Sequence, residues 1–119
     1  MKCLMLPACL FFVFFINSCT AEESPKVVVE KFFEAIQKDD TSMLLKYATP
    51  EFYENSQGRG NRRDSYSDIR LEVARFGKIT VTSEEIDGNT ATVYIEDEGG
   101  RQEYIKLEKI NGEWKADLY

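Results

Sequence analysis

The chain has 119 residues, enough for one domain, and carries 15 Lys and Arg against 21 Asp and Glu, a net charge of −6 with no histidine. Without histidine, Ser-His-Asp and Cys-His catalysis are excluded, and the commonest neutral-pH base and zinc ligand is missing. A net acidic chain is also a poor nucleic-acid binder, because contacts with phosphates supply most of that affinity. We therefore expect no nucleic-acid partner, no metal and no cofactor.

The first 18 residues have the pattern of a secretory signal peptide. Lys2 is followed by an almost unbroken apolar run from Leu4 to Ile16. This run is too short to cross a bilayer, which needs about 20 residues, and the small polar residues after it are typical of a cleavage region. We expect residues 1–18 to be removed and to contribute nothing to the fold.

The apolar run ends in Ile16-Asn17-Ser18-Cys19, which resembles the lipobox of bacterial lipoproteins. In that family the cysteine thiol receives a diacylglyceryl group, signal peptidase II cleaves before the cysteine, and the cysteine becomes the N-terminus. Asn17 is an unusual residue for the middle position. The resemblance implies lipidation of Cys19 and a lipid anchor in the cell envelope, in the outer membrane. Cleavage after Ala21, which releases a soluble protein, and an uncleaved anchor are the alternatives.

The cysteines agree with this interpretation. All three, Cys3, Cys9 and Cys19, lie in this segment, so an exported domain would have no disulfide and would depend on its core alone. Two or three acyl chains on Cys19 would hold the protein firmly to a membrane, whereas one chain binds only marginally. Lys2 is the only charged residue before Cys19, so the rest of the chain is even more acidic. The lipid, rather than the protein surface, is expected to make the membrane contact.

Residues 19–23 would form the lipidated N-terminus and a short tether. The acidic pair Glu22-Glu23, so close to the lipidated residue, resembles the surface-export signal of some Bacteroidetes lipoproteins. The alternative is a solvated tether without a signal. Both interpretations stay open, and with them the side of the outer membrane on which the domain would lie.

Residues 24–119 are expected to form a single domain that begins with helices. Ser24 can cap the free N–H groups of a first helix, and Pro25 suits its first position. Apolar residues then recur at helical spacing. A second short helix, capped by Asp40 or Thr41, follows.

The pattern repeats further along the chain. Thr49-Pro50 predicts one more turn of helix, and the polar residues 55–64, with two glycines, predict a loop. A third helix is expected over about residues 65–76, with Gly77 as its stop. The apolar faces of the helices are expected to include Val28, Val29, Phe32, Phe33, Ile36, Met43, Leu44, Tyr47, Tyr66, Ile69, Val73 and Phe76.

After Gly77 the apolar period falls from 3.6 to 2, which predicts β-strands. Tight turns are marked by Asp87-Gly88, by Gly99-Gly100 and, most strongly, by Asn111-Gly112. Four strands joined by three tight turns predict an antiparallel meander with one apolar face, and Trp114 is expected on that face. Three helices packed on a four-stranded sheet give an α+β domain.

Three segments carry a resemblance to a known superfamily: the helix SPKVVVEKFFEAIQKDD, the stretch MLLKYATPEF and the closing strand NGEWKADLY. They resemble the nuclear transport factor 2-like (NTF2-like) superfamily, which includes ketosteroid isomerases and SnoaL-type polyketide cyclases. The layout is similar to that of small bacterial lipoproteins carrying a domain of unknown function from this superfamily. The resemblance implies a cone-shaped, cystatin-like domain over residues 24–119, often with an open cavity and a dimer on the outer sheet face. The fold alone does not show whether the cavity serves catalysis, binds a ligand or does neither.

Few residues suggest chemistry. In the isomerases a carboxylate base follows the second helix, and Glu51 and Glu54 lie near that place, but no local motif assigns either, so no catalytic residue is named. Arg59, Arg62 and Arg63 are candidate ligand contacts, because guanidinium groups pair with carboxylates and phosphates. The alternative is a solvated loop.

The polar sheet face is expected to mix aromatic rings with charges, in Tyr94, Tyr104, Lys106, Lys115 and Tyr119. Such a surface is common in interfaces, so a homodimer or an envelope protein partner fits there, as does a merely solvated face. The sequence thus predicts a lipid-anchored, non-catalytic envelope protein that binds a small ligand or a protein partner. One alternative is an isomerase or cyclase with a deep cavity and a carboxyl group of raised pKa; the other is a structural subunit.

Overall fold

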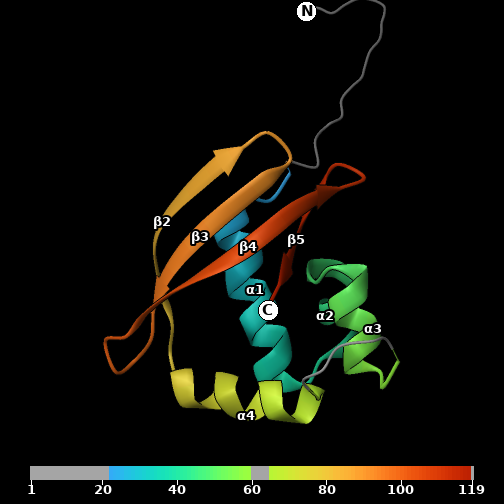
Figure 1. Ribbon diagram of the computed structural model, residues 1–119, viewed down its shortest axis with the longest axis vertical. Helices are drawn as coiled ribbons and strands as arrows, with labels where there is room; N and C mark the ends of the chain where they lie inside the picture. Colours follow the sequence, from blue (N-terminus) through green and yellow to red (C-terminus); the bar gives the residue numbers. More distant parts are fainter. Residues whose placement is uncertain (1–21, 60–64, 119) are drawn as a thin grey trace, which may run out of the picture.

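The computed structural model describes residues 22–59 and 65–118, which form an α+β domain (Figure 1). The helices within these residues are α1 (Pro25–Lys38), α2 (Thr41–Tyr47), α3 (Pro50–Ser56) and α4 (Tyr66–Phe76). The strands are β2 (Thr80–Asp87), β3 (Thr90–Glu96), β4 (Gln102–Ile110) and β5 (Glu113–Asp117). They form one antiparallel sheet in the order β2-β3-β4-β5, as the meander predicts. The predicted signal peptide and lipobox lie outside the described residues.

Each helix begins at a side chain that caps it. The hydroxyl of Ser24 accepts the N–H of α1's third residue, and the carboxylate of Asp40, rather than the hydroxyl of Thr41, caps α2. Thr49 and Ser65 cap α3 and α4 in the same way. These bonds satisfy N–H groups that have no partner inside the helix. None of the helices in the described part of the chain is long and apolar enough to cross a bilayer.

The segment after Thr49 forms more helix than the sequence predicts. One turn is expected there, but α3 continues to Ser56, so the described residues form four helices rather than three, and the loop predicted from residue 55 begins only after Ser56. The hydroxyl of Ser56 donates to the carbonyl of Tyr53 at 2.6 Å, and the N–H of Gln57 donates to the carbonyls of Tyr53 and Glu54. These local polar bonds complete the helix end, and apolar periodicity carries no signal for them.

The apolar face of the sheet is confirmed. The inward-facing residues of β3, β4 and β5 are buried, and they are Ala91, Val93, Ile95, Ile105, Leu107, Trp114 and Ala116. At the turn between β4 and β5, Asn111 and Gly112 have φ angles of 52° and 81°, the positive values that a two-residue type I′ hairpin turn requires.

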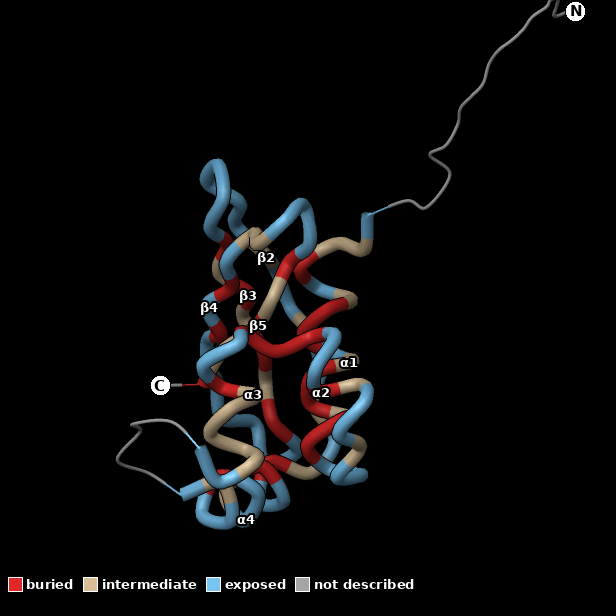
Figure 2. Tube along the Cα trace, turned by 90° about the vertical axis from the view of Figure 1, so that its right-hand side faces the viewer, coloured by how far each residue is buried: buried red, intermediate tan, exposed pale blue. Residues whose placement is uncertain are grey.

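The helices cover one face of the sheet, and the buried residues lie between the two layers (Figure 2). Helix α1 packs against β2, β3 and β5 as well as against α2 and α4. The outer edge of β5 is covered by the link between α2 and α3, where Ala48 pairs with Ala116 and the N–H of Thr49 donates to the Ala116 carbonyl at 2.9 Å. A strand edge that would otherwise be unpaired is therefore closed.

Aromatic rings fill the interior where the helices meet. The ring of Phe32 lies 5.7 Å from that of Phe33 and 5.0 Å from that of Phe52, centre to centre. Phe33 in turn contacts Phe76 at 5.8 Å, and Phe52 contacts Tyr66 at 6.1 Å. Edge-to-face contacts of this kind stabilise beyond the burial of apolar area. One cluster of rings thus joins α1, α3 and α4.

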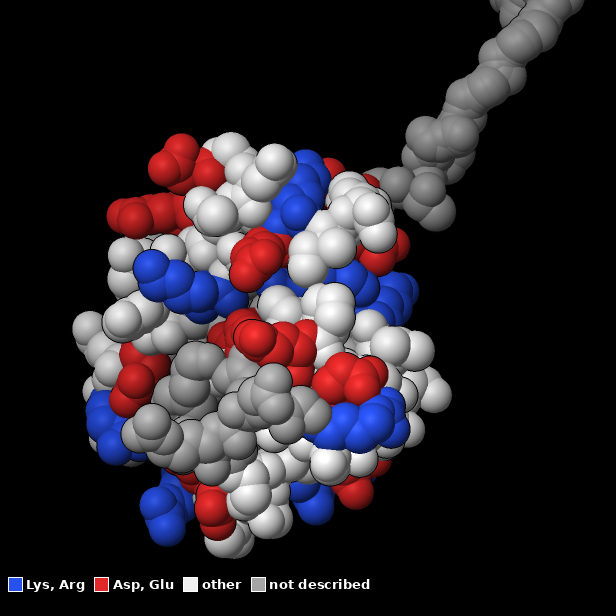
Figure 3. All heavy atoms as spheres, turned by 45° about the vertical axis from the view of Figure 1, so that its right-hand side comes forward, with Lys and Arg blue, Asp and Glu red and all other residues white. Residues whose placement is uncertain are grey.

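Charged side chains on the surface pair with one another, and both signs are interspersed over the face shown in Figure 3. Lys38 lies 2.8 Å from Glu34 one turn earlier in α1. The guanidinium of Arg101 lies 3.3 Å from Asp97 and 3.4 Å from Glu103. The carboxylate of Asp97 also accepts the N–H of Arg101 at 2.8 Å, which closes the turn between β3 and β4.

The same turn is bound to the end of α4 through Glu98. Its N–H donates to the carbonyl of Phe76 at 2.9 Å, and its carboxylate accepts the N–H of Lys78 at 3.0 Å. Gly77, the predicted helix stop, lies between these two bonds with φ 64°, a conformation that glycine adopts without steric cost. A methyl group at Gly77 would overlap with the carboxylate of Glu98.

We predict that Gly77→Ala lowers the free energy of unfolding by about 2–4 kcal/mol, from backbone strain and the displaced Glu98 hydrogen bond. Gly88→Ala is the matched control, because Gly88 has φ 63° and no heavy atom near the added methyl; it should cost only the backbone strain, about 1–2 kcal/mol. Urea unfolding of residues 20–119 measures both. Equal losses in the two variants would show that the contact with Glu98 contributes nothing.

Candidate functional site

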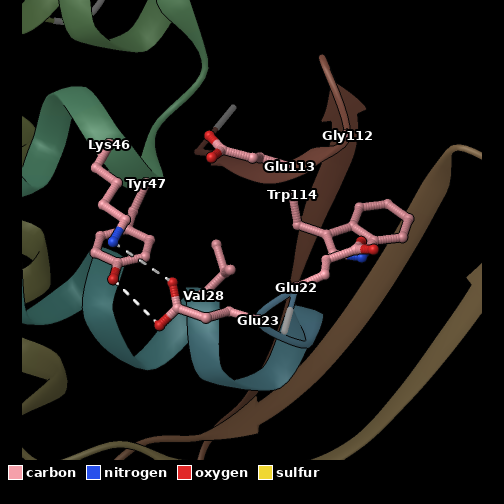
Figure 4. Close-up of a pocket in the computed structure, with 8 residues that line it drawn as sticks. All are labelled: Glu22, Glu23, Val28, Lys46, Tyr47, Gly112, Glu113 and Trp114. Atoms are coloured by element: carbon pink, nitrogen blue, oxygen red, sulfur yellow. Dashed lines mark hydrogen bonds and ion pairs between the residues drawn. The ribbon is translucent and has the colours of Figure 1, made fainter. Parts of the chain in front are cut away.

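A hollow of about 420 Å³ lies where the start of the described chain meets the end of the sheet (Figure 4). We call residues 22–24 the N-terminal arm. The hollow is lined by arm residues, by α1 and α2 and by the turn between β4 and β5, through Glu22, Glu23, Val28, Lys46, Tyr47, Gly112, Glu113 and Trp114. Tyr47 and Trp114 lie on opposite sides of it, with Val28 and Glu23 between them.

Glu23 attaches the arm to α2. The hydroxyl of Tyr47 donates to its carboxylate at 3.2 Å, and the ammonium of Lys46 lies 3.9 Å away (dashed lines in Figure 4). Its interaction with Tyr47, and then the negative charge of Glu23, raise the pKa of Lys46 above its ordinary value. Lys46 is positively charged at neutral pH and attracts the Glu23 carboxylate.

Glu22 attaches the arm to the sheet. The ammonium of Lys109, on β4, lies 3.0 Å from the Glu22 carboxylate and 5.4 Å from the ring centre of Trp114 on β5. A cation over an indole face is attracted by the ring's electrons. Lys109 thus bonds to the arm on one side and to a core residue on the other, since Trp114 is only 5% exposed.

Lys115 closes the other side of the hollow and corrects one prediction. It was expected on the exposed sheet face, but its side chain is only 14% exposed; it donates to the carbonyl of Lys46 and lies 3.4 Å from Glu113. The last carbonyls of a helix have no intrahelical partner, so a cation at the end of α2 is favourable. Lys115 therefore joins β5 to α2, and little of its side chain is exposed on the sheet face.

The predicted ligand contacts are only partly within the described residues. Arg62, Arg63 and the lipidation candidate Cys19 lie outside them. Arg59 is described, and its guanidinium pairs with both carboxylate oxygens of Glu54, at 2.6 and 3.3 Å. This hydrogen bonding lowers the pKa of Glu54 below its ordinary value. Ligand binding by these three arginines stays a prediction, and one of them, Arg59, already pairs with a carboxylate of the same chain.

The sheet face keeps its mixture of rings and charges. Tyr104 is 60% exposed, lies opposite Tyr94 on β3 and has the ammonium of Lys106 5.8 Å from its ring centre. The hydroxyl of Tyr94 donates to Glu85 at 3.3 Å. Tyr119, also expected on this face, lies outside the described residues. The interface role of this face stays a prediction.

A second hollow, of about 450 Å³, lies beside Tyr104 at the end of β5. It combines apolar and charged side chains and is lined by Thr49, Phe76, Glu103, Tyr104, Ile105, Lys106, Glu108, Asp117 and Leu118. Its inner wall is held in place because the hydroxyl of Thr49 donates to the carboxylate of Asp117 at 3.0 Å. The hollow and the exposed Tyr104 ring thus form one continuous surface.

Two carboxyl groups at the surface, those of Glu34 and Glu54, have pKa values lowered by hydrogen bonds to Lys38 and Arg59. At these two groups the pKa is shifted in the direction opposite to that expected of a catalytic carboxyl group buried in a cavity. Within residues 22–59 and 65–118, no three Asp, Glu or Cys side chains gather closely enough to hold a metal ion.

The chain matches no protein-family model and no curated protein. Its fold is similar to that of a SEC-C motif containing protein from Rhodopseudomonas palustris, at 16% identity and a TM-score of 0.51, over 80% of this chain and 76% of that one. It is also similar to a de novo designed NTF2 fold protein, at 18% identity and a TM-score of 0.50, over 80% and 84%. The domain has an NTF2-like fold.

An NTF2-like protein of unknown function from Silicibacter pomeroyi is also found, at 14% identity and a TM-score of 0.48, over 76% of this chain and 85% of that one. The similarity to the designed NTF2 fold protein confirms the predicted α+β cone, while lipidation and bacterial origin stay predictions. The contacts of the N-terminal arm were not predicted. Glu22 and Lys109 are far apart in the sequence, and no local pattern links them.

We predict that Arg59→Gln returns the pKa of Glu54 toward that of an ordinary glutamate, measured by carbon NMR titration of its carboxyl group. Because the pKa is lowered in the folded state, the pair stabilises the fold above the ordinary glutamate pKa, and this contribution is lost as the pH falls through the lowered pKa. Lys38→Gln is the control: it should raise the pKa of Glu34 and leave that of Glu54 unchanged. An unchanged Glu54 pKa in Arg59→Gln would show that Arg59 is free to bind a ligand.

Proposed function

We propose that the chain is a lipid-anchored protein of the bacterial cell envelope, whose NTF2-like domain binds a ligand or a protein partner without catalysing a reaction. The proposal of a lipid anchor is supported by the sequence Ile16-Asn17-Ser18-Cys19 at the end of a short apolar run. Cleavage before Cys19 would remove none of the residues that form the helices and strands described above.

The binding role is supported by what occupies the interior and what is exposed. Rings of α1, α3 and α4 fill the space between them, whereas Tyr104 and the 450 Å³ hollow beside it lie at the surface. An exposed aromatic ring next to a hollow of mixed polarity is typical of binding surfaces. We place the ligand or partner there.

We expect Cys19→Ser to abolish fatty-acid labelling and to move the chain from the membrane to the soluble fraction of a bacterial host. The unchanged chain should incorporate an alkyne fatty acid and have the intact mass of residues 19–119 with a diacylglyceryl group. Cys9→Ser is the matched control and should keep the label. Inhibition of signal peptidase II should cause the uncleaved precursor to accumulate. A mature chain that begins at Glu22 would show cleavage after Ala21 and overturn the anchor.

For the binding surface, we predict that Tyr104→Ser removes the mass that accompanies the envelope-purified protein in native mass spectrometry. Its ring is 60% exposed, so the fold should tolerate the change. Leu71→Ser on α4 removes an equally exposed apolar side chain, 62% exposed, and should keep the bound mass. Retention of that mass by Tyr104→Ser would locate the binding surface elsewhere.

A further inference from the structure

The N-terminal arm is bound to the domain at two points, on two different sides. Glu22 pairs with Lys109 of the sheet, while Glu23 pairs with Lys46 and Tyr47 of α2. The two side chains point in opposite directions, one beside Trp114 and the other toward Tyr47 (Figure 4), as successive residues of an extended chain do. Attachment at two points resists rotation as well as displacement.

We infer that this arm orients the domain on the membrane, so that one end of the sheet faces the lipid head groups. The inference rests on the proposed lipid at Cys19. The membrane-facing end consists of the arm, the turn between β2 and β3, and the turn between β4 and β5. The end of β4 that leads into the second turn lies beside the first turn, because the N–H of Lys109 donates to the carbonyl of Asn89 at 2.8 Å. Helix α4 and the turn between β3 and β4 lie at the opposite end (Figure 1).

The distance argument depends on covalent geometry. Three peptide units join Cys19 to Glu22, and consecutive Cα atoms are 3.8 Å apart, so the lipid-bearing residue lies within about 11 Å of the arm. If the arm were unbound, the chain could turn freely up to Pro25, where α1 begins, and the reach would double to about 23 Å. While Glu22 and Glu23 are bound, the reach is therefore halved and rotation about the tether is restricted.

The charges at this end suit a surface of phospholipid head groups. Both arm glutamates are paired with lysines, and Glu113 is paired with Lys115 at 3.4 Å. The protein as a whole is acidic, with a net charge of −6, and an unpaired acidic end would be repelled by anionic lipids over roughly a Debye length. Pairing reduces this repulsion, so that the exposed Asp87 at the end of β2 is the acidic residue of this end for which no ion pair is described.

The orientation has a consequence for the proposed binding surface. Tyr104 lies near the start of β4, opposite the part of β3 that leads into the far turn. The hollow beside it also includes Phe76 at the end of α4. This surface is therefore held away from the head groups, where a partner can reach it. The acidic pair has this structural role whether or not it is also an export signal.

The chain has a single tryptophan, Trp114, and it lies at the membrane-facing end. The test is energy transfer from Trp114 to dansyl-labelled phosphatidylethanolamine, with the full lipoprotein reconstituted in phosphatidylcholine vesicles. For each variant, Trp114 emission is compared with and without the dansyl label. We expect Glu22→Gln/Glu23→Gln to reduce the transfer at least twofold. The control Glu30→Gln/Asp68→Asn removes the same charge from exposed positions on α1 and α4 and should match the unchanged protein.

Two further measurements complete the experiment. Insertion of five glycine and serine residues after Ala21 should reduce the energy transfer, which would show that the transfer reports distance. Addition of 1 M NaCl should screen the ion pairs and lower the energy transfer of the unchanged protein toward that of Glu22→Gln/Glu23→Gln. Equal transfer in the unchanged protein and in Glu22→Gln/Glu23→Gln, with the lipid on Cys19 verified by mass, would overturn the inference. If no variant carries the lipid or binds vesicles, the proposed anchor fails and the orientation with it. In that case the arm contacts are tested in solution, by comparing the emission maximum of Trp114 in the unchanged protein and in Glu22→Gln/Glu23→Gln.

Discussion

The paired rings of Phe32 and Phe33 on α1 are the contact on which the rest of the domain depends. One ring meets Phe52 of α3 and the other meets Phe76 at the end of α4, so α1 holds both smaller helices against the sheet. Phe76 in turn is followed by Gly77 and the bond to Glu98 that fixes the far turn of the sheet. Because the interior is occupied by rings, the groups able to contact other molecules lie at the surface.

The elements of this fold follow largely from local sequence signals. The caps at Ser24 and Thr49, the stop at Gly77 and the turn at Asn111-Gly112 each depend on residues within about four positions of one another. Apolar periodicity is also a local signal, and it predicted which faces of the helices and strands are buried. The NTF2-like arrangement itself came from a resemblance and was confirmed by solved structures of the same fold.

The features that the sequence did not predict involve residues distant along the chain. The pair Glu22–Lys109 and the bond from Lys115 to the end of α2 depend on how α2 lies beside β5. Periodicity specifies which face of an element is buried, but not which charged side chain reaches around its edge. The predicted turn of helix after Thr49 continues into a second turn for another reason: Ser56, after Tyr53, completes that turn with a bond from its hydroxyl to the Tyr53 carbonyl.

The arm is a marginal contact, and that follows from its energetics. Ordering two residues costs about 2–4 kcal/mol in conformational entropy. Two exposed ion pairs return about 0.2–1 kcal/mol each, and the bond from Tyr47 and the Lys109–Trp114 contact add about 1–3 kcal/mol together. Gain and cost nearly cancel, so the arm belongs to the least stable part of the domain, where opening does not require global unfolding. If Cys19 carries the proposed lipid, an arm held in this way would keep the domain close to the membrane at low ionic strength and would release it to the full reach of its tether when salt screens the pairs.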